Sequence, residues 1–342
     1  MRRNFSAYSL LSYVCSFAHE TRTHSKKMHG KSRIPSLGVA DRLVCLAMKV
    51  MRRLRLRTLT WRLYQLHWRA AKSLLMQTLG EQLAKYSGVR TQTSPPPREI
   101  FNLWFQGFSD VPPIVRLCTN RAGRLGLRQV LLDDADVETL GIDEVMVRKH
   151  KEGKISMQTW SDIIRTYLLS HRGGVWADAS LYVSKLPEDA LAQPFYSCRH
   201  RIADNFVENP SIFRAQSGQF ESKWTFFFLA SHKGDVVTSW LYDCFTQYWR
   251  VWDAGVDYFL CDMILRLGYE EVPAVRREID AIGVNNDGTL YALRHILSQD
   301  FDPDIWQKWG QNTLNVFKLD WRIGTDAMSA RSYFGRLKEE LL

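Results

Sequence analysis

The sequence predicts an α/β fold, in which a central sheet is flanked by helices and preceded by a basic helical extension. From residue 100 onwards, short apolar segments alternate with helical segments. This alternation is typical of strands joined by right-handed helical crossovers. Before residue 100, apolar residues recur at helical spacing among many arginines and lysines. The 342 residues suffice for one large domain or two.

The net positive charge of the chain comes from its first 99 residues. They contain 19 Lys and Arg against 4 Asp and Glu, a net charge of +15, whereas the remainder contains 27 against 32 and carries −5. This asymmetry indicates a basic arm that meets a polyanion, either an anionic membrane surface or a nucleic acid. The six cysteines are scattered without a C-x-x-C pair, which favours a reducing compartment over a disulfide framework or a zinc site.

Four segments are expected along the chain. Residues 1–40 are polar and lack a clear period, which indicates a disordered or loosely ordered basic segment. Residues 41–90 are predicted to form a basic amphipathic helical extension. Its apolar stripe consists of Leu43, Leu46, Ala47, Val50 and Leu54. Three prolines indicate a linker at 91–99, and the body spans 100–342.

The helical extension at 41–90 is of the kind that lies on anionic lipid headgroups. A helix packed on the body explains its spacing equally well. No apolar run reaches the ~18 residues of a membrane-spanning helix, and no signal peptide is predicted. We therefore expect a cytoplasmic protein, peripheral at the inner face of the cell membrane. Nucleic-acid binding by the basic arm is the alternative, which the amphipathic spacing disfavours.

The body is predicted to alternate strands and helices. Strands are expected at 100–105, 127–134, 175–177, 180–184, 194–199 and 226–230. Helices are expected at 111–121, 157–171, 235–250, 257–267 and 274–281. Gly173 or Gly174 ends the helix at 157–171. The run 175–177 is apolar on both faces, as expected of a strand buried in a parallel sheet.

Asp162, Arg165 and Asp178 are the candidate catalytic residues. Asp162 and Arg165 lie three positions apart on one predicted helix, so their side chains project together. Asp178 follows a predicted strand, and ligands of open α/β sheets bind outside the carboxyl ends of strands. A structural ion pair, with Asp178 capping a turn, is the alternative. The absence of GxGxxG, P-loop, GxSxG and HExxH motifs weighs against dehydrogenases, P-loop enzymes, α/β-hydrolases and zinc proteases.

Three motifs surround these residues in a fixed order. They are Trp104-Phe-Gln106-Gly107, then Ser161-Asp162-Ile-Ile-Arg165, then Gly173-Gly174-Val-Trp176-Ala-Asp178-Ala-Ser180. The order resembles glycosyltransferases of the capsular polysaccharide synthesis type, which are related to family 32 glycosyltransferases and more remotely to glucosylating toxins. The resemblance covers about residues 98–260 and extends towards the KLDW sequence at 318–321.

The resemblance implies a GT-A fold, a Rossmann-like sheet that binds a nucleotide-sugar. It implies transfer of a sugar from a nucleoside diphosphate, expected to be UDP, onto a capsular, exopolysaccharide or other glycan acceptor, with retention of configuration. The implied donor-binding residues are Trp104, Gln106, Asp162, Arg165, Gly173, Gly174, Asp178 and Lys318. Trp104 would stack near the donor base, with a core tryptophan as the alternative. Lys318 would approach the diphosphate, with a surface lysine as the alternative.

The resemblance also implies a Mn²⁺ or Mg²⁺ ion held by a D-x-D motif. Asp178 matches the first acid of that motif, but Ser180 stands in place of the second. Because a hydroxyl is a weaker ligand than a carboxylate, this substitution puts the metal in doubt. Asp262, Asp257 and the Ser180 hydroxyl are the three candidates to complete the metal shell. The same substitution keeps open a non-catalytic binding protein on a degenerate transferase fold.

Overall fold

The computed structural model describes residues 32–89, 98–187, 189–201, 214–217, 220–283, 285, 289–311 and 315–340. Residues 34–342 form one compact unit. Most of the predicted loosely ordered segment, residues 1–31, lies outside the described residues. So do residues 90–97, which contain most of the predicted linker.

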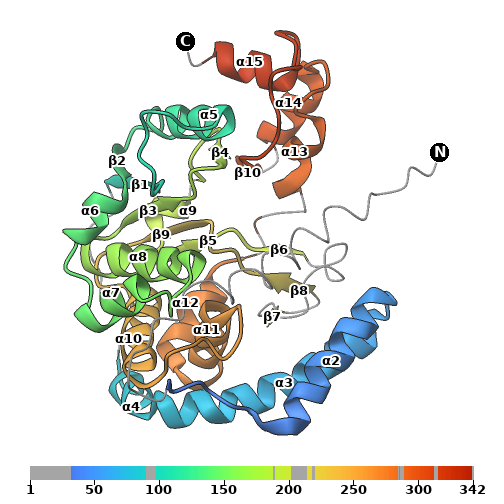
Figure 1. Ribbon diagram of the computed structural model, residues 1–342. Coiled ribbons are helices and arrows are strands. Elements are labelled where there is room, and N and C mark those ends of the chain that lie inside the picture. The colour runs from blue at the N-terminus through green and yellow to red at the C-terminus, as the bar shows by residue number, and fades with distance from the viewer. Residues whose placement is uncertain are drawn as a thin grey trace. The chain divides into compact units, whose positions relative to one another are not determined.

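A five-stranded sheet lies at the centre of this unit (Figure 1). Its strand order is β2 (Arg128–Leu132), β1 (Glu99–Leu103), β3 (Gly174–Ala177), β9 (Phe228–Ser231) and β5 (Phe195–Ser197). β1 pairs in parallel with β2 and β3, whereas β9 pairs antiparallel with β3 and β5. The predicted α/β fold is confirmed with one correction: β3 has a parallel and an antiparallel neighbour, so the sheet is mixed.

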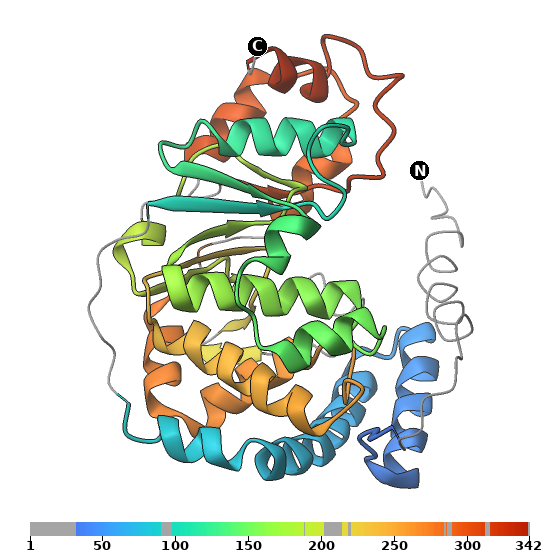
Figure 2. The ribbon, with the colours of Figure 1, turned by 60° about the vertical axis from the view of Figure 1, so that its left-hand side comes forward.

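Helices cover both faces of the central sheet (Figure 2). On one face lie α7 (Glu144–Lys151), α8 (Met157–Arg172), α10 (Val236–Val251), α11 (Leu260–Glu271) and α12 (Pro273–Ala281). On the other lie α5 (Pro113–Ala122), α13 (Ala292–Ile296), α14 (Pro303–Gln311) and α15 (Tyr333–Glu339). Because both faces are covered, β3 and β9 are buried along their whole length and read as continuous apolar runs.

Two smaller sheets accompany the central one. β4 (Leu181–Val183) pairs antiparallel with β10 (Val316–Lys318), which sets Lys318 opposite Leu181. β6 (His200–Arg201), β8 (Phe220–Lys223) and β7 (Arg214–Ser217) form a three-stranded sheet. The remaining elements are short: α6 (Asp134–Glu138), α9 (Asp189–Ala192) and the 3-10 helix η1 (Thr289–Tyr291). The β4–β10 pairing matters most here, because it brings the C-terminal part of the chain to the segment after β3.

The predicted basic extension consists of α2 (Gly38–Arg53), α3 (Arg57–Thr78) and α4 (Gly80–Tyr86). α3 and α4 contribute buried side chains to the main core, namely Tyr64, Trp68, Ala71, Leu75, Leu79 and Tyr86. α2 packs on α3 and has no fully buried residue. α3 and α4 therefore pack on the body, which is one of the two roles considered for the extension. α2 leaves an apolar stripe exposed, and its role as a membrane-binding helix stays a prediction. None of the described helices combines the length and apolarity that crossing a membrane requires.

Candidate donor-binding site

The candidate site lies where the strand order of the central sheet reverses. From β1 the chain first crosses to β2 on one side, and later returns to β3 on the other side of β1. Ligands of open α/β sheets bind at the carboxyl ends of strands that flank such a reversal. Trp104 directly follows β1 and Asp178 directly follows β3, so the fold places both at this point.

The backbone around Asp178 is fixed from both sides. Its N–H donates to the carbonyl oxygen of Phe227 at 2.9 Å, and its own carbonyl accepts from Leu181 N–H at 2.8 Å. The first bond ties the end of β3 to the segment before β9. The second forms the turn that leads into β4. The side chain of Asp178 is therefore presented from a rigid corner between two sheets.

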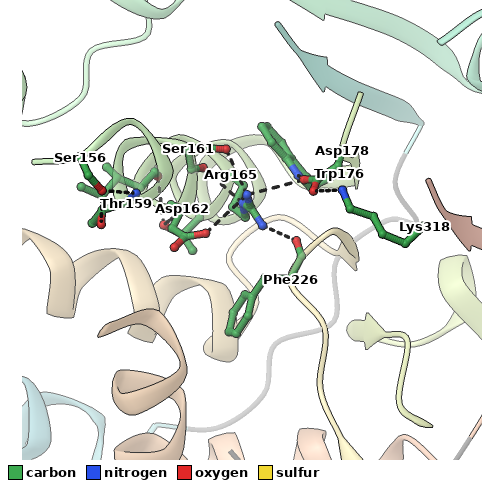
Figure 3. Close-up of polar contacts among 11 residues, drawn as sticks. Ser156, Thr159, Ser161, Asp162, Arg165, Trp176, Asp178, Phe226 and Lys318 are labelled. Atoms are coloured by element: carbon green, nitrogen blue, oxygen red, sulfur yellow. Dashed lines mark hydrogen bonds and ion pairs between the residues drawn. The ribbon is translucent and has the colours of Figure 1, made fainter. Parts of the chain in front are cut away.

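The Asp178 carboxylate accepts or faces three donor groups (Figure 3). Lys318 Nζ lies 2.7 Å from Oδ2, and Trp176 Nε1 donates to Oδ1 at 2.9 Å. The Arg165 guanidinium lies 3.6 Å from Oδ1. Burial raises the pKa of Asp178, but Lys318 and Arg165 outweigh it and hold the pKa below its ordinary value. Asp178 is therefore a carboxylate at neutral pH.

Arg165 is held by the protein on several sides. Its guanidinium donates to the Ser161 hydroxyl at 3.0 Å and to the Phe226 carbonyl at 2.5 Å. It also lies over the ring of Trp176, 5.1 Å from the ring centroid. These contacts fix the planar cation before any ligand arrives, which lowers the entropy cost of binding an anionic group.

Asp162 completes the predicted trio on α8. Its carboxylate lies 3.4 Å from Arg165, and its side chain is 16% exposed. Burial raises the pKa of Asp162 to about 6, and the Arg165 guanidinium offsets this only in part. Asp162 is therefore ionised at neutral pH, in a position to accept hydrogen bonds from hydroxyl groups.

Lys318 reaches the site from β10. Besides Asp178, its ammonium donates to the Ser180 hydroxyl at 3.1 Å, and it lies 5.5 Å from the Phe227 ring centroid. Five residues that the sequence singled out, Asp162, Arg165, Asp178, Ser180 and Lys318, thus form one cluster. Their side chains carry two negative and two positive charges.

The two predicted donor-binding glycines lie apart from this cluster. Gly173 and Gly174 stand at the start of β3, four residues and about 13 Å of strand from Asp178. Both have positive φ, and a Cβ at Gly174 would lie 2.4 Å from the Phe101 ring. Close packing between this part of the chain and its neighbours explains why both positions are glycine. Gln106 is exposed in the turn after β1.

Trp104 is half-buried in a small apolar cluster with Phe108, Val111, Val115 and Ala179. Its outer edge meets Trp321, whose ring centroid lies 5.8 Å away in an edge-to-face arrangement. Trp321 is 42% exposed and was not predicted as a site residue. The signal for it was the KLDW sequence, which carries Lys318 and Trp321 three residues apart. Together the two tryptophans offer an aromatic surface beside the charged cluster.

The residues around Asp178 do not fit a divalent cation in this arrangement. The expected first and third positions of the D-x-D motif, Asp178 and Ser180, are bridged by the Lys318 ammonium. At about 4 Å and an effective dielectric constant of about 20, the Lys318 ammonium would repel Mn²⁺ or Mg²⁺ by about 8 kcal/mol, which offsets the attraction of the Asp178 carboxylate at the same distance. Asp257, a candidate for the metal shell, lies 3.2 Å from His67 instead.

Among the described residues, one group of His, Cys and acidic side chains has metal-like spacing: Asp41, Cys45 and His67. It lies between α2 and α3. There His67 Nδ1 is 2.8 Å from Asp41 and Nε2 faces Asp257, an arrangement that a charged histidine explains. Among the described residues, no group of three His, Cys or acidic side chains with metal-like spacing lies at Asp178. The metal at Asp178 therefore stays a prediction.

Comparisons with known proteins bear on the identity of the chain. No curated protein matches it. Among solved structures, a protein described as "PaToxG Glycosyltransferase" is similar, with 12% identity, 64% of this chain and 83% of that chain covered, and a TM-score of 0.33. The family described as "Capsular polysaccharide synthesis protein" matches residues 60–337, which include α3, the central sheet and Lys318. The chain belongs to the capsular polysaccharide synthesis protein family, which confirms the predicted resemblance and supports the predicted class of enzyme, a glycosyltransferase.

Proposed function

We propose that the protein transfers a sugar from a nucleoside diphosphate donor, UDP being the first to test, onto a glycan acceptor. The observation that carries this proposal is the cluster of Asp178, Arg165 and Lys318 at the reversal point of the sheet. Two fixed cations suit the oxygens of a diphosphate, and carboxylates suit the hydroxyls of a ribose or a hexose. The Trp104–Trp321 surface suits a planar base.

The proposed reaction is a retaining, front-face displacement. The bond between the anomeric carbon and the diphosphate oxygen breaks, and the acceptor oxygen bonds to the same face of that carbon. The acceptor hydroxyl proton passes to an oxygen of the leaving phosphate, so no protein nucleophile is needed. The protein contributes position and charge stabilisation, which together supply most of the rate in such transfers.

The test is nucleoside diphosphate release from a panel of nucleotide-sugars, with and without glycan acceptors. Full-length protein should release the diphosphate, and Asp178→Ala and Arg165→Ala should each lower turnover by about 100-fold or more. Lys151→Ala is the control, because Lys151 forms an exposed ion pair with Glu138. Unchanged turnover in both site variants would show that the site is elsewhere. Binding of UDP without turnover would instead favour the non-catalytic alternative.

We also propose that α2 and the start of α3 bind an anionic membrane surface. Fifteen large apolar side chains are exposed among the described residues, and ten of them lie between residues 34 and 76. Along α2 and at its C-cap they form one stripe at helical spacing: Val39, Leu43, Leu46, Val50 and Leu54. A contiguous exposed apolar stripe marks an interaction surface, and an apolar stripe beside a basic face is typical of an interfacial helix.

The charges around this stripe favour lipid headgroups as the partner. The exposed basic side chains are Arg42, Lys49, Arg52, Arg53, Arg55, Arg62 and Arg69. Asp41 is the one acidic residue between positions 34 and 80, and it points towards His67. The outer face of α2 is therefore both apolar and cationic, which complements anionic headgroups above acyl chains. A nucleic acid would use the charge but not the leucines.

Co-sedimentation with phosphatidylglycerol–phosphatidylcholine vesicles tests the membrane proposal. The full chain should bind, less strongly in high salt, and Leu43→Ser/Leu46→Ser should weaken binding by at least about tenfold. The matched control is Leu131→Ser/Met157→Ser, which changes two exposed apolar residues on other elements. Full-length protein that stays in the supernatant, or that binds duplex DNA in preference to vesicles, would contradict the proposal.

A further inference from the structure

We infer that Lys318 and Arg165 take the place of the divalent cation, so that this site transfers sugar without a metal ion. The inference rests on the proposed nucleotide-sugar reaction and specifies its chemistry. Its starting point is the position of the Lys318 ammonium, between Asp178 Oδ2 and the Ser180 hydroxyl. These two side chains are the ones that a D-x-D metal site would use.

The serine at position 180 allows a single positive charge to balance the site. A carboxylate at position 180 would add a second negative charge beside Asp178 and call for a divalent ion. With Ser180 the local demand falls to one carboxylate and one neutral acceptor, which a single ammonium satisfies at 2.7 and 3.1 Å. The charge of Lys318 is therefore matched to a site that has one carboxylate and one hydroxyl.

The cations around Asp178 supply the charge that a divalent ion would supply. Lys318 lies 2.7 Å and Arg165 3.6 Å from opposite oxygens of the carboxylate, a total of two positive charges. Both oxygens are thereby engaged, and Trp176 donates to one of them as well. A metal ion would therefore have to share each oxygen of Asp178 with one of these donors or displace it.

Lys318 can still bind the leaving group. An ammonium has three N–H donors, and Asp178 and Ser180 use two of them among the described residues. Its side chain is 22% exposed, so the third donor can meet a diphosphate oxygen. As the bond from the anomeric carbon to the diphosphate oxygen breaks, the growing negative charge is neutralised by the Lys318 ammonium. The acceptor proton leaves with the phosphate.

The experiment compares turnover and UDP binding in EDTA with the same measurements in Mn²⁺ or Mg²⁺. Full-length wild type should keep its turnover and its affinity for UDP after EDTA treatment. Lys318→Met should lower both by about 10- to 100-fold, Lys318→Arg should recover part of the loss, and the exposed Lys151→Met should change neither. A transition near the wild-type temperature in thermal unfolding would show that the variants fold.

A second variant reverses the substitution. Ser180→Asp/Lys318→Ala restores two acids and removes the ammonium, so its UDP affinity should rise at least about tenfold with Mn²⁺ and fall again with EDTA. Loss of wild-type turnover or UDP binding in EDTA, with recovery on adding Mn²⁺, would overturn the inference and leave the proposed function intact. Absence of UDP or nucleotide-sugar binding under every condition would instead contradict the proposed function itself.

Discussion

Lys318 and Asp178 are 140 positions apart in the chain, yet their charged groups lie 2.7 Å from each other. The contact depends on the pairing of β4 with β10, which sets Lys318 opposite Leu181, three residues after Asp178. Arg165 approaches the same carboxylate from α8. The candidate site therefore depends on one carboxylate that orders two cations.

Asp178→Asn should uncouple this arrangement. The amide keeps the shape of the carboxylate but removes the charge that attracts Lys318 and Arg165, so donor binding should weaken and turnover should fall by about 100-fold. Steady-state kinetics with a responsive nucleotide-sugar measures the effect. Asp110→Asn, at an exposed position before α5, is the control. If Asp178→Asn retained the turnover of the wild type, Asp178 would have no role in the reaction.

Turnover should depend on the ionisation of Asp162. Burial raises its pKa to about 6, so the carboxylate that accepts hydrogen bonds forms only as pH rises through that value. We expect kcat/KM to fall as pH is lowered through about 6. Asp162→Asn should have lower activity and should lack this acidic limb. The same limb in both proteins would assign the titration to another group.

His67 should contribute stability that disappears in alkali. Burial lowers its pKa, but hydrogen bonds with Asp257, Cys45 and Asp41 dominate and raise the pKa to about 11. Because the folded pKa lies above the unfolded value, the stabilisation is complete below about pH 6.5 and is lost as pH rises through about 11.

His67→Asn should therefore lower the free energy of unfolding at pH 7 by about 2–3 kcal/mol, because it leaves two partly buried acids without the cation that they share. The difference from wild type in chemical denaturation should shrink between pH 7 and pH 10. His295→Asn, at an exposed position on α13, provides the comparison. A difference that grew with pH would mean that His67 is neutral in the folded protein.

Gly174→Ala should destabilise the fold. Because Gly174 lies away from the candidate site, this variant tests packing and not donor binding. A Cβ there would lie 2.4 Å from the Phe101 ring, on a backbone with φ of 136°. Gly153→Ala is a matched control, because Gly153 has φ of 74° and nothing within 4 Å of its Cβ position. The control should lose about 1–2 kcal/mol from backbone strain alone, and Gly174→Ala more. Equal losses in the two variants would remove the packing explanation.

The local part of the site could be predicted from the sequence. α8, the glycines that end it, β3 and Asp178 are consecutive in the chain, so their order and spacing specify how they meet. The mixed character of the sheet could not be predicted in this way. β9, which begins within the predicted run at 226–230, is buried on both faces, and a buried apolar run has the same pattern in a parallel or an antiparallel strand.

Lys318 was a candidate from the sequence, but its contact with Asp178 could not be predicted, because that contact depends on a three-residue strand whose partner is far away in the chain. Short strands carry little periodic signal, and their pairing is decided by the packing around them. In this protein α5, α13 and α15 pack around Tyr182 and Phe317, and this cluster holds β4 and β10 together. For the same reason, the contact between Trp104 and Trp321 was not expected.

The late position of β10 has a consequence for the order in which the protein is made. At typical synthesis rates of ~5–20 residues per second, the ribosome adds Lys318 roughly 7–30 s after Asp178. By the end of that interval every strand of the central sheet has been synthesised, but the carboxylate still lacks its ammonium partner. In terms of the proposed reaction, a nascent chain lacks one of the two cations of the site until β10 has been made.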